Sequence, residues 1–201
     1  MFKKTKKILS IALCLVTLSS TTIFADSFVG NKPINKSTKD SSFLFSIDGY
    51  TFKYENAPQE LKDNYDKNCK ELGITPKADS EIFVPKDEMN KYQQTYNIDD
   101  SISTYGTFNI YYKDTYFEVT GSRNYKVYTT TYVGYGYVTR GNPVHLVQLL
   151  LKGTGYSVGI DSIFGSDTYN KVKMFQSSNG LTSDGIVGLG TWQTFRSVLR
   201  L

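Results

Sequence analysis

Histidine and cysteine are almost absent from this chain. Its 201 residues include one histidine and two cysteines. Zinc hydrolases use about three protein ligands, usually several histidines, and His145 alone cannot form such a set. A cysteine nucleophile would need a histidine base beside Cys69, and the chain has neither a Gly-x-Ser-x-Gly motif nor a glycine-rich phosphate loop. We therefore expect no metal, no cofactor and none of these hydrolase centres.

Long hydrophobic runs are also missing. The run from Ile8 to Val16, apolar apart from Ser10, is shorter than the roughly 20 residues that span a bilayer. Four lysines precede this run, and the small Ala25 stands before Asp26. This pattern is typical of a secretory signal. We predict a signal peptide over 1–25 and a secreted, extracellular mature chain with no membrane contact; the open alternative is an uncleaved anchor.

No excess of one charge remains after cleavage. The 23 basic residues fall to 19 when the four signal lysines leave, which equals the 19 acidic residues. Nucleic-acid binders usually show a basic excess, so we expect no nucleic-acid partner. The mature chain keeps only Cys69, within a helical pattern, which excludes an internal disulfide and favours a small buried side chain. We expect a monomer.

The residue pattern before position 139 indicates a leader followed by a small α+β domain. Residues 26–41 are rich in Asn, Lys, Ser and Thr and indicate a flexible leader. Residues 42–138 form the α+β domain. Near its start, Asp48-Gly49 lies between two alternating apolar runs and predicts a β-hairpin.

Two helices are expected after this hairpin. Asn56 and Gln59 have the spacing of a helix cap, and Gly73 would end the first helix. Pro85 favours the start of the second helix, because the first turn does not need its missing N–H.

Tyrosine-rich segments follow. Nine tyrosines lie between Tyr105 and Tyr137, and Lys113-Asp114 and the segment 121–124 divide the region into three strands. The composition predicts an antiparallel β-meander. The tyrosines either fill and flank this sheet or form an aromatic surface that stacks on sugar rings, and the alternation places aromatics on both faces.

Three amphipathic helical patterns occupy 139–201 and predict an all-α three-helix bundle. In the first, Val144, Val147 and Leu151 share one face. The additional leucines of that helix widen its apolar surface around most of the circumference: Leu146, Leu149 and Leu150. We expect this outer face to dock on the meander near 132–137; the alternative is a partner inside the bundle.

One phrase is written twice, 23 residues apart. Asp161-Ser162-Ile163-Phe164-Gly165-x-x-Thr168 is followed by Asp184-Gly185-Ile186-Val187-Gly188-x-x-Thr191. Each Asp can bind its following amides in an Asx-type turn. Each Ile would fill the space between helices, and each Thr would lie in the first helical turn. Gly165 and Gly188 would allow the sharp backbone path into the helix. We call each copy a cassette.

These residues resemble the peptidoglycan-binding domain-like family, a three-helix module of bacterial cell-wall hydrolases. The matching residues are Val144-x-x-Val147-Gln148-x-x-Leu151, Gly155-Tyr156, both cassettes, Val172-x-x-Phe175-Gln176, Gly180-Leu181 and Trp192. Ser162 and Lys171 depart from the family pattern. The resemblance implies a cell-wall location and a peptidoglycan partner, and says nothing about 42–138. The positions it implies for ligand binding are Tyr156, Asp161, Ser162, Asp184 and Trp192.

Three functions remain open. The first is a non-catalytic carbohydrate-binding protein of the bacterial cell wall, in which 42–138 adds a second contact. The second is a glycosidase-type wall hydrolase, which needs only two carboxylates. The carboxylates available to it are Glu55, Glu60, Glu71, Glu81, Glu88 and Glu118. The third is a structural or partner-binding protein. The missing hydrolase motifs favour the first function, the non-catalytic wall-binding protein, and we assign no catalytic residue.

Overall fold

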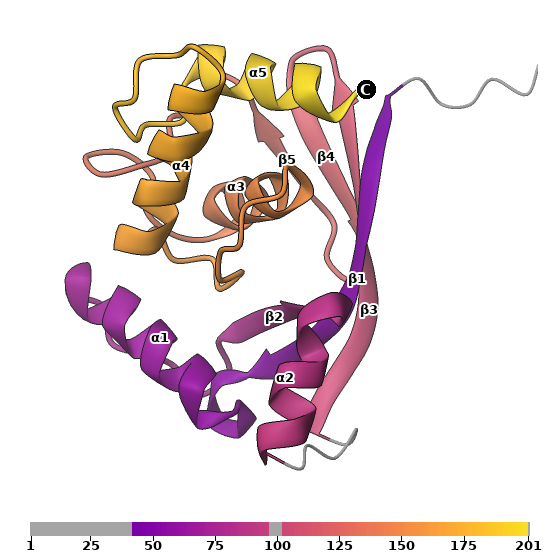
Figure 1. Ribbon diagram of the computed structural model, residues 1–201, viewed down its shortest axis with the longest axis vertical. Helices are drawn as coiled ribbons and strands as arrows, with labels where there is room; N and C mark the ends of the chain where they lie inside the picture. The colour runs from indigo at the N-terminus through magenta and orange to yellow at the C-terminus, as the bar shows by residue number, and fades with distance from the viewer. Residues whose placement is uncertain (1–41, 97–101, 201) are drawn as a thin grey trace, which may run out of the picture. The chain divides into compact units, whose positions relative to one another are not determined.

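A five-stranded antiparallel sheet runs through this computed structural model, which describes residues 42–96 and 102–200 (Figure 1). The strand order is β2-β1-β3-β4-β5, and all four neighbouring pairs are antiparallel. The strands are β1 (Phe43–Lys53), β2 (Glu81–Pro85), β3 (Ser103–Lys113), β4 (Tyr116–Gly121) and β5 (Tyr125–Tyr128). The expected signal peptide and leader, 1–41, lie outside the described residues. The α+β class is confirmed.

Strands β3, β4 and β5 form the predicted meander. The chain turns at Asp114, which has a positive φ of 52°, and again after Gly121. Burial alternates along β3, where Phe108, Ile110 and Tyr112 are buried and their neighbours are less so. One face of the meander is therefore apolar and faces the helices, as a period of two residues requires.

The predicted hairpin at Asp48-Gly49 is wrong, because β1 continues straight through both residues. Gly49 pairs with Pro85 on one side and with Gly106 on the other. A Cβ on Gly49 would lie 2.3 Å from the Val84 carbonyl oxygen and 2.5 Å from a ring carbon of Phe83. The glycine thus permits close packing inside a central strand instead of a turn. The short strand β2, which supplies these neighbours, was not predicted.

Two helices connect the strands of the N-terminal half. They are α1 (Gln59–Glu71), after a short 3₁₀ turn η1 (Tyr54–Asn56), and α2 (Lys86–Tyr96). The expected cap by Asn56 is wrong: Pro58 occupies the N-cap position without a side-chain bond, and Gln59 Nε2 donates to Asp63. Gly73 follows the helix with a φ of +64°, as expected for a helix end. Cys69 is buried.

The C-terminal helices form where the sequence predicts them. They are α3 (Asn142–Gly153), α4 (Ser166–Ser178) and α5 (Leu189–Leu199). Figure 1 shows α3 between the sheet and α4, and every residue of α3 from Val144 to Leu151 is buried. No helix among the described residues is long and apolar enough to cross a membrane.

Helix α3 docks on the sheet through β5 and β1. The His145 ring lies edge-on to Phe108 at 4.8 Å and to Tyr125 at 5.8 Å between ring centroids. The segment 132–137, which we expected to receive this helix, pairs instead with the second cassette through Val133 and Val187. The prediction that this helix docks on the sheet is therefore correct, but the predicted contact with residues 132–137 is wrong.

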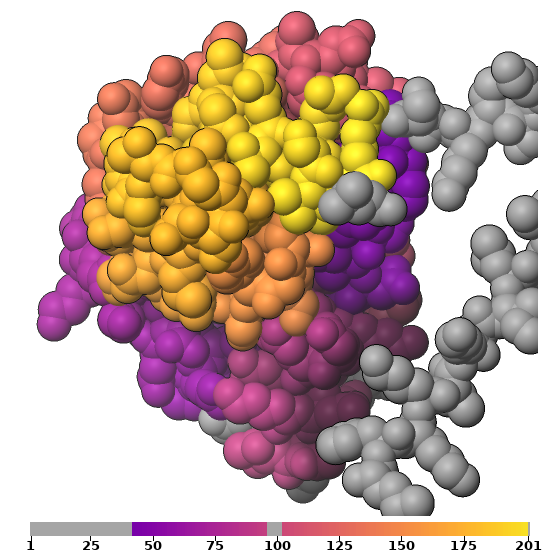
Figure 2. All heavy atoms as spheres, turned by 45° about the horizontal axis from the view of Figure 1, so that its top comes forward, coloured from indigo at the N-terminus to yellow at the C-terminus, as the bar shows by residue number. Residues whose placement is uncertain are grey.

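The hydrophobic core does not follow the predicted domain boundary at 138/139. One cluster of buried residues combines β3, β4 and β5 with the three C-terminal helices. A second cluster combines β1, α1, β2 and α2, and it includes Ile163 of the first cassette. Residues 38–201 form one compact unit, and Figure 2 shows the orange and yellow C-terminal residues directly against the indigo and magenta N-terminal ones. The boundary itself stays a prediction.

His145 is buried at the contact between α3 and the sheet. Its Nδ1 lies 2.6 Å from the Tyr125 hydroxyl oxygen. Burial, with a smaller effect of Arg123, lowers the pKa of His145 to about 3, and burial raises the pKa of Tyr125. Both side chains are therefore neutral at pH 7, and the phenol O–H donates to the imidazole.

We predict an acid-sensitive stability that depends on this histidine. The folded pKa lies below the unfolded value of about 6.5, so the contribution is complete above the unfolded pKa and is lost as pH falls toward the folded one. The free energy of unfolding should fall by about 2 kcal/mol more between pH 7 and pH 5 in the parent than in His145→Gln. Denaturant titrations at both pH values test this. Equal slopes with pH in the two proteins would contradict it.

Candidate functional site

The first cassette is organised by the buried Gln148 of α3. Its Nε2 donates to Asp161 Oδ1 at 2.7 Å and to the Ile163 carbonyl oxygen at 3.1 Å. Its Oε1 accepts from the backbone N–H groups of Asp161 and Ser162. The Ile163 N–H donates to Asp161 Oδ1 at 2.9 Å, which closes the expected Asx turn. One glutamine thus satisfies three backbone groups of this loop, the N–H groups of Asp161 and Ser162 and the carbonyl of Ile163.

The second cassette repeats this arrangement around Gln176 of α4. Its Nε2 donates to Asp184 Oδ1 at 2.8 Å and to the Ile186 carbonyl oxygen at 2.9 Å, and its Oε1 accepts from the Gly185 N–H. The Ile186 N–H donates to Asp184 Oδ1. In both copies the glutamine also reaches the buried threonine of the next helix, Thr168 or Thr191, at 3.2 Å. The repeated phrase is therefore a repeated structure.

The two copies differ in burial and in backbone strain. Asp161 is buried and receives a further hydrogen bond, from Asn68 Nδ2 of α1, whereas Asp184 is exposed. Burial raises the pKa of Asp161, against the opposing effect of these hydrogen bonds. Ser162 has a φ of 64°, where the second cassette has Gly185 at 77°. The first copy thus holds an L-residue in the left-handed region, which costs roughly 1–2 kcal/mol.

Close approach explains the glycine that precedes the helix in each cassette, Gly165 or Gly188. Gly165 and Gly188 have ordinary negative φ values. A Cβ on Gly165 would lie 2.1 Å from Asn68 Oδ1, and one on Gly188 would lie 2.8 Å from the Tyr132 ring. The expected role in steering the backbone is replaced by contact with distant parts of the chain.

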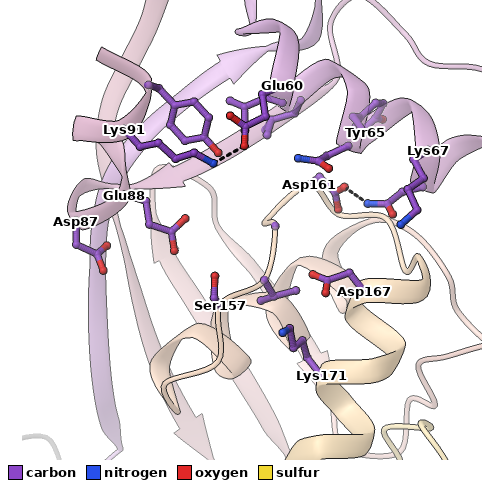
Figure 3. Close-up of a pocket in the computed structure, with 17 residues that line it drawn as sticks. Glu60, Tyr65, Lys67, Asp87, Glu88, Lys91, Ser157, Asp161, Asp167 and Lys171 are labelled. Carbon is purple, nitrogen blue, oxygen red and sulfur yellow. Dashed lines mark hydrogen bonds and ion pairs between the residues drawn. The ribbon is translucent and has the colours of Figure 1, made fainter. Parts of the chain in front are cut away.

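A cleft of about 700 Å³ lies between α1, α2, the loop 157–161 and the start of α4 (Figure 3). Its apolar lining comes from residues of α1, β2 and the loop: Leu61, Tyr65, Ile82 and Val158. Its polar lining includes Asn64, Asn68 and Ser157. The Asn68–Asp161 hydrogen bond, drawn in Figure 3, joins two of these elements at 2.8 Å. Cavities of about 300–1,000 Å³ are typical of small-ligand sites.

Charged side chains of both signs surround the cleft. Lys91 pairs with Glu60, and Lys152 pairs with Asp87 at 3.0 Å and with Glu88 at 2.6 Å. The remaining charges are Lys67 of α1 and Lys171 and Asp167 of α4. Among the described residues, no carboxylate lies within 4 Å of the ammonium groups of Lys67 or Lys171.

A tyrosine surface lies over the second cassette; we define it as Tyr132, Tyr135, Tyr137 and Tyr169. Tyr132 and Tyr137 stack with ring centroids 5.2 Å apart, and Tyr135 lies 5.3 Å from Tyr169. The first three side chains are 48%, 39% and 54% exposed. Tyr132, Tyr135 and Tyr137 therefore present apolar ring surface to solvent.

The residues that the resemblance suggested for ligand binding are scattered. Asp161 lines the cleft, and Ser162 and Tyr156 are half-buried. Asp184 is exposed in the second cassette. Trp192 is fully buried, and its indole N–H donates to the Thr131 carbonyl oxygen at 2.8 Å. Direct ligand contact by Trp192 would need a rearrangement of the core, and the five assignments stay predictions.

Sequence reasoning did not find the cleft, because its walls come from elements far apart in the chain. Lys67 and Lys171 carried no signal in the sequence beyond the note that Lys171 departs from the family pattern. Within the described ranges, His, Cys, Asp and Glu form no cluster of three that could hold a metal ion.

Two family models described as peptidoglycan-binding domains match this chain, at residues 33–110 and at residues 140–195. The chain therefore belongs to the peptidoglycan-binding domain family. The N-terminal match adds a second such domain, which our reading of the residue patterns did not identify. It is similar to a peptidoglycan-binding protein from Clostridioides difficile, whose crystal structure is a complex with glutamine hydroxamate. The two are 38% identical with a TM-score of 0.68, over 76% of this chain and 93% of that one.

The two aspartates provide a matched test of the cassettes. We expect Asp184→Ala to lower the free energy of unfolding by about 1 kcal/mol, the scale of one lost hydrogen bond at an exposed site. Asp161→Ala should cost about 2–4 kcal/mol, because it removes the hydrogen bonds from Gln148 and Asn68 and leaves the buried Ile163 N–H without its acceptor. Chemical denaturation measures both values. Equal losses at the two positions would reject this account of their difference.

Proposed function

We propose that this protein is secreted and binds peptidoglycan non-covalently at the cell wall, without cleaving it. The supporting observation is that two separate regions of one chain match peptidoglycan-binding domain models. The similar protein from Clostridioides difficile is also named a peptidoglycan-binding protein. We propose that both regions contribute to binding, because their cores and the cleft join them into one unit.

The carboxylates favour binding over hydrolysis. A glycosidase needs a protonated carboxylic acid near a second carboxylate. Glu60, Asp87 and Glu88 each pair with a lysine instead of with a second carboxylate. Outside the cleft, Glu81 pairs with Arg123 and Glu118 with Lys126, and Glu71 accepts two hydrogen bonds from Ser166. Asp161 has a raised pKa, but both of its oxygens already accept hydrogen bonds inside the protein.

The tyrosine surface is our candidate for the glycan contact. Sugar rings expose apolar C–H faces, and the negative faces of aromatic rings complement them. Tyr132 and Tyr137 are already stacked on each other, so binding orders few additional rotamers.

Purified cell-wall sacculi test the proposal. The mature chain should co-sediment with sacculi, and the turbidity of the suspension should stay constant. Tyr132→Ala with Tyr137→Ala should weaken co-sedimentation roughly tenfold, since aromatic contacts are worth about 0.5–1.5 kcal/mol each.

The matched control replaces Tyr105 and Tyr128 by alanine, because these side chains are similarly exposed, at 50% and 55%, but lie on strands β3 and β5, outside the tyrosine surface. Falling turbidity would favour the wall hydrolase. The absence of both binding and clearing would favour the structural or partner-binding role.

Secretion has its own test. Protein recovered from the culture medium or the wall fraction should have the intact mass of a chain that begins at Asp26, because the signal pattern ends at Ala25. A dominant species that retains Met1 would reject cleavage.

A further inference from the structure

The charges of the cleft do not match a glycan. The glycan strand of peptidoglycan is uncharged between its peptide stems, because the lactyl carboxyl group is consumed in the amide bond to the stem. A neutral ligand would offer no charge to the ammonium groups of Lys67 and Lys171, neither of which forms an ion pair within 4 Å among the described residues. Glu71 acts on Lys67 only through space. Figure 3 shows these lysines on different helices, α1 and α4, around the same cleft.

The other ionic groups of the cleft already have ion-pair or hydrogen-bond partners within the protein. Glu60 is paired with Lys91, and Asp87 and Glu88 share Lys152. Asp161 accepts hydrogen bonds from Gln148, Asn68 and the Ile163 N–H. Two ammonium groups and the carboxylate of Asp167 remain to meet a ligand. The complementary molecule has carboxylates in excess of amines and at least one amine.

We propose that this cleft binds the peptide stem of peptidoglycan, with Lys67 and Lys171 receiving its carboxylates and Asp167 its free amine. Stems have this charge balance, because a γ-linked glutamate keeps its α-carboxylate, the C-terminus is free, and a diamino acid supplies the amine. The cleft volume of about 700 Å³ accommodates a short peptide. The side-chain amides of Asn64 and Asn68 can bind peptide groups, and Leu61 and Val158 can contact alanine methyl groups. This assignment rests on the proposed function and names the part of the polymer that the cleft recognises.

The test uses the mature full chain and the synthetic stem L-Ala-γ-D-Glu-meso-diaminopimelate-D-Ala. Calorimetric titration at low ionic strength should show binding by the parent protein. Lys67→Gln with Lys171→Gln should weaken it at least tenfold, because charge-assisted hydrogen bonds are lost. The double arginine variant at the same positions should retain most of the affinity, since the charge and donors persist.

Two controls separate a specific contact from a general charge effect. Lys53→Gln with Lys70→Gln removes the same charge from exposed lysines outside the cleft, and its affinity should stay within about twofold of the parent. A stem whose carboxylates are all amidated should bind the parent and the Lys67/Lys171 glutamine variant equally weakly. If the two lysines contact the carboxylates directly, removing the carboxylates makes the lysine substitutions ineffective, as a double-mutant cycle requires.

The outcomes are distinguishable from those of the proposed function. If the parent binds sacculi but not the stem, or if the Lys67/Lys171 glutamine variant binds the stem as the parent does, the cleft assignment is overturned and wall binding stands. If the Lys53/Lys70 glutamine control loses as much affinity for the stem as the Lys67/Lys171 glutamine variant, the cleft assignment is also overturned. If the parent binds neither sacculi nor the stem, the proposed function fails with it.

Discussion

The carboxylate of Asp161 is the acceptor on which the arrangement of the two halves depends. It receives hydrogen bonds from Gln148 on α3, from Asn68 on α1 and from the backbone of its own loop. A buried carboxylate is unfavourable unless such donors surround it. Helix α1 and the first cassette therefore satisfy each other's polar groups through the Asn68–Asp161 hydrogen bond. Both residues line the cleft, so this bond fixes one of its sides.

A second contact strengthens the same junction. Helix α4 begins without a side-chain cap of its own. Glu71 at the end of α1 supplies one from a distance, since its carboxylate accepts from the Ser166 N–H at 2.7 Å and from the Ser166 hydroxyl at 2.8 Å. A carboxylate at a helix N-terminus also complements the helix dipole. The junction is thus polar at its rim and apolar behind it, where Ile163 packs in the core cluster of α1 and α2.

The predictable parts of the fold depend on interactions between residues close in sequence. Each cassette was predicted correctly as an Asx turn before a helix, because its aspartate, amides and threonine lie within a few residues of one another. The failures come from distant neighbours. Gly49 looked like a turn residue, but it makes room for Phe83 and Val84, and Gly165 makes room for Asn68.

The candidate site shows the same division. Asp161 was predicted as a ligand-binding residue from the family resemblance, and it lines the cleft. Lys67 and Lys171 are separated by about half of the chain, and only the packing of α4 near α1 brings them to one cavity. The exposed tyrosines were anticipated as a sugar-stacking surface, but their support by the second cassette was not. Val133 and Val187 pair although helices α3 and α4 lie between them in the chain. Trp192 could not be assigned from its residue type, since an indole serves a core as well as a surface.

The shared core has a consequence for how the chain folds. Strands β3, β4 and β5 form from neighbouring segments, but their apolar face is covered only by helices that come later in the chain. During refolding the meander would therefore expose Phe117, Val119 and Val127 until α3 and α5 arrive. Closing such non-local contacts requires loop entropy to be lost first, which slows folding. An uncovered apolar sheet is also a site for aggregation. The chain should thus gain its stability in one late, cooperative step.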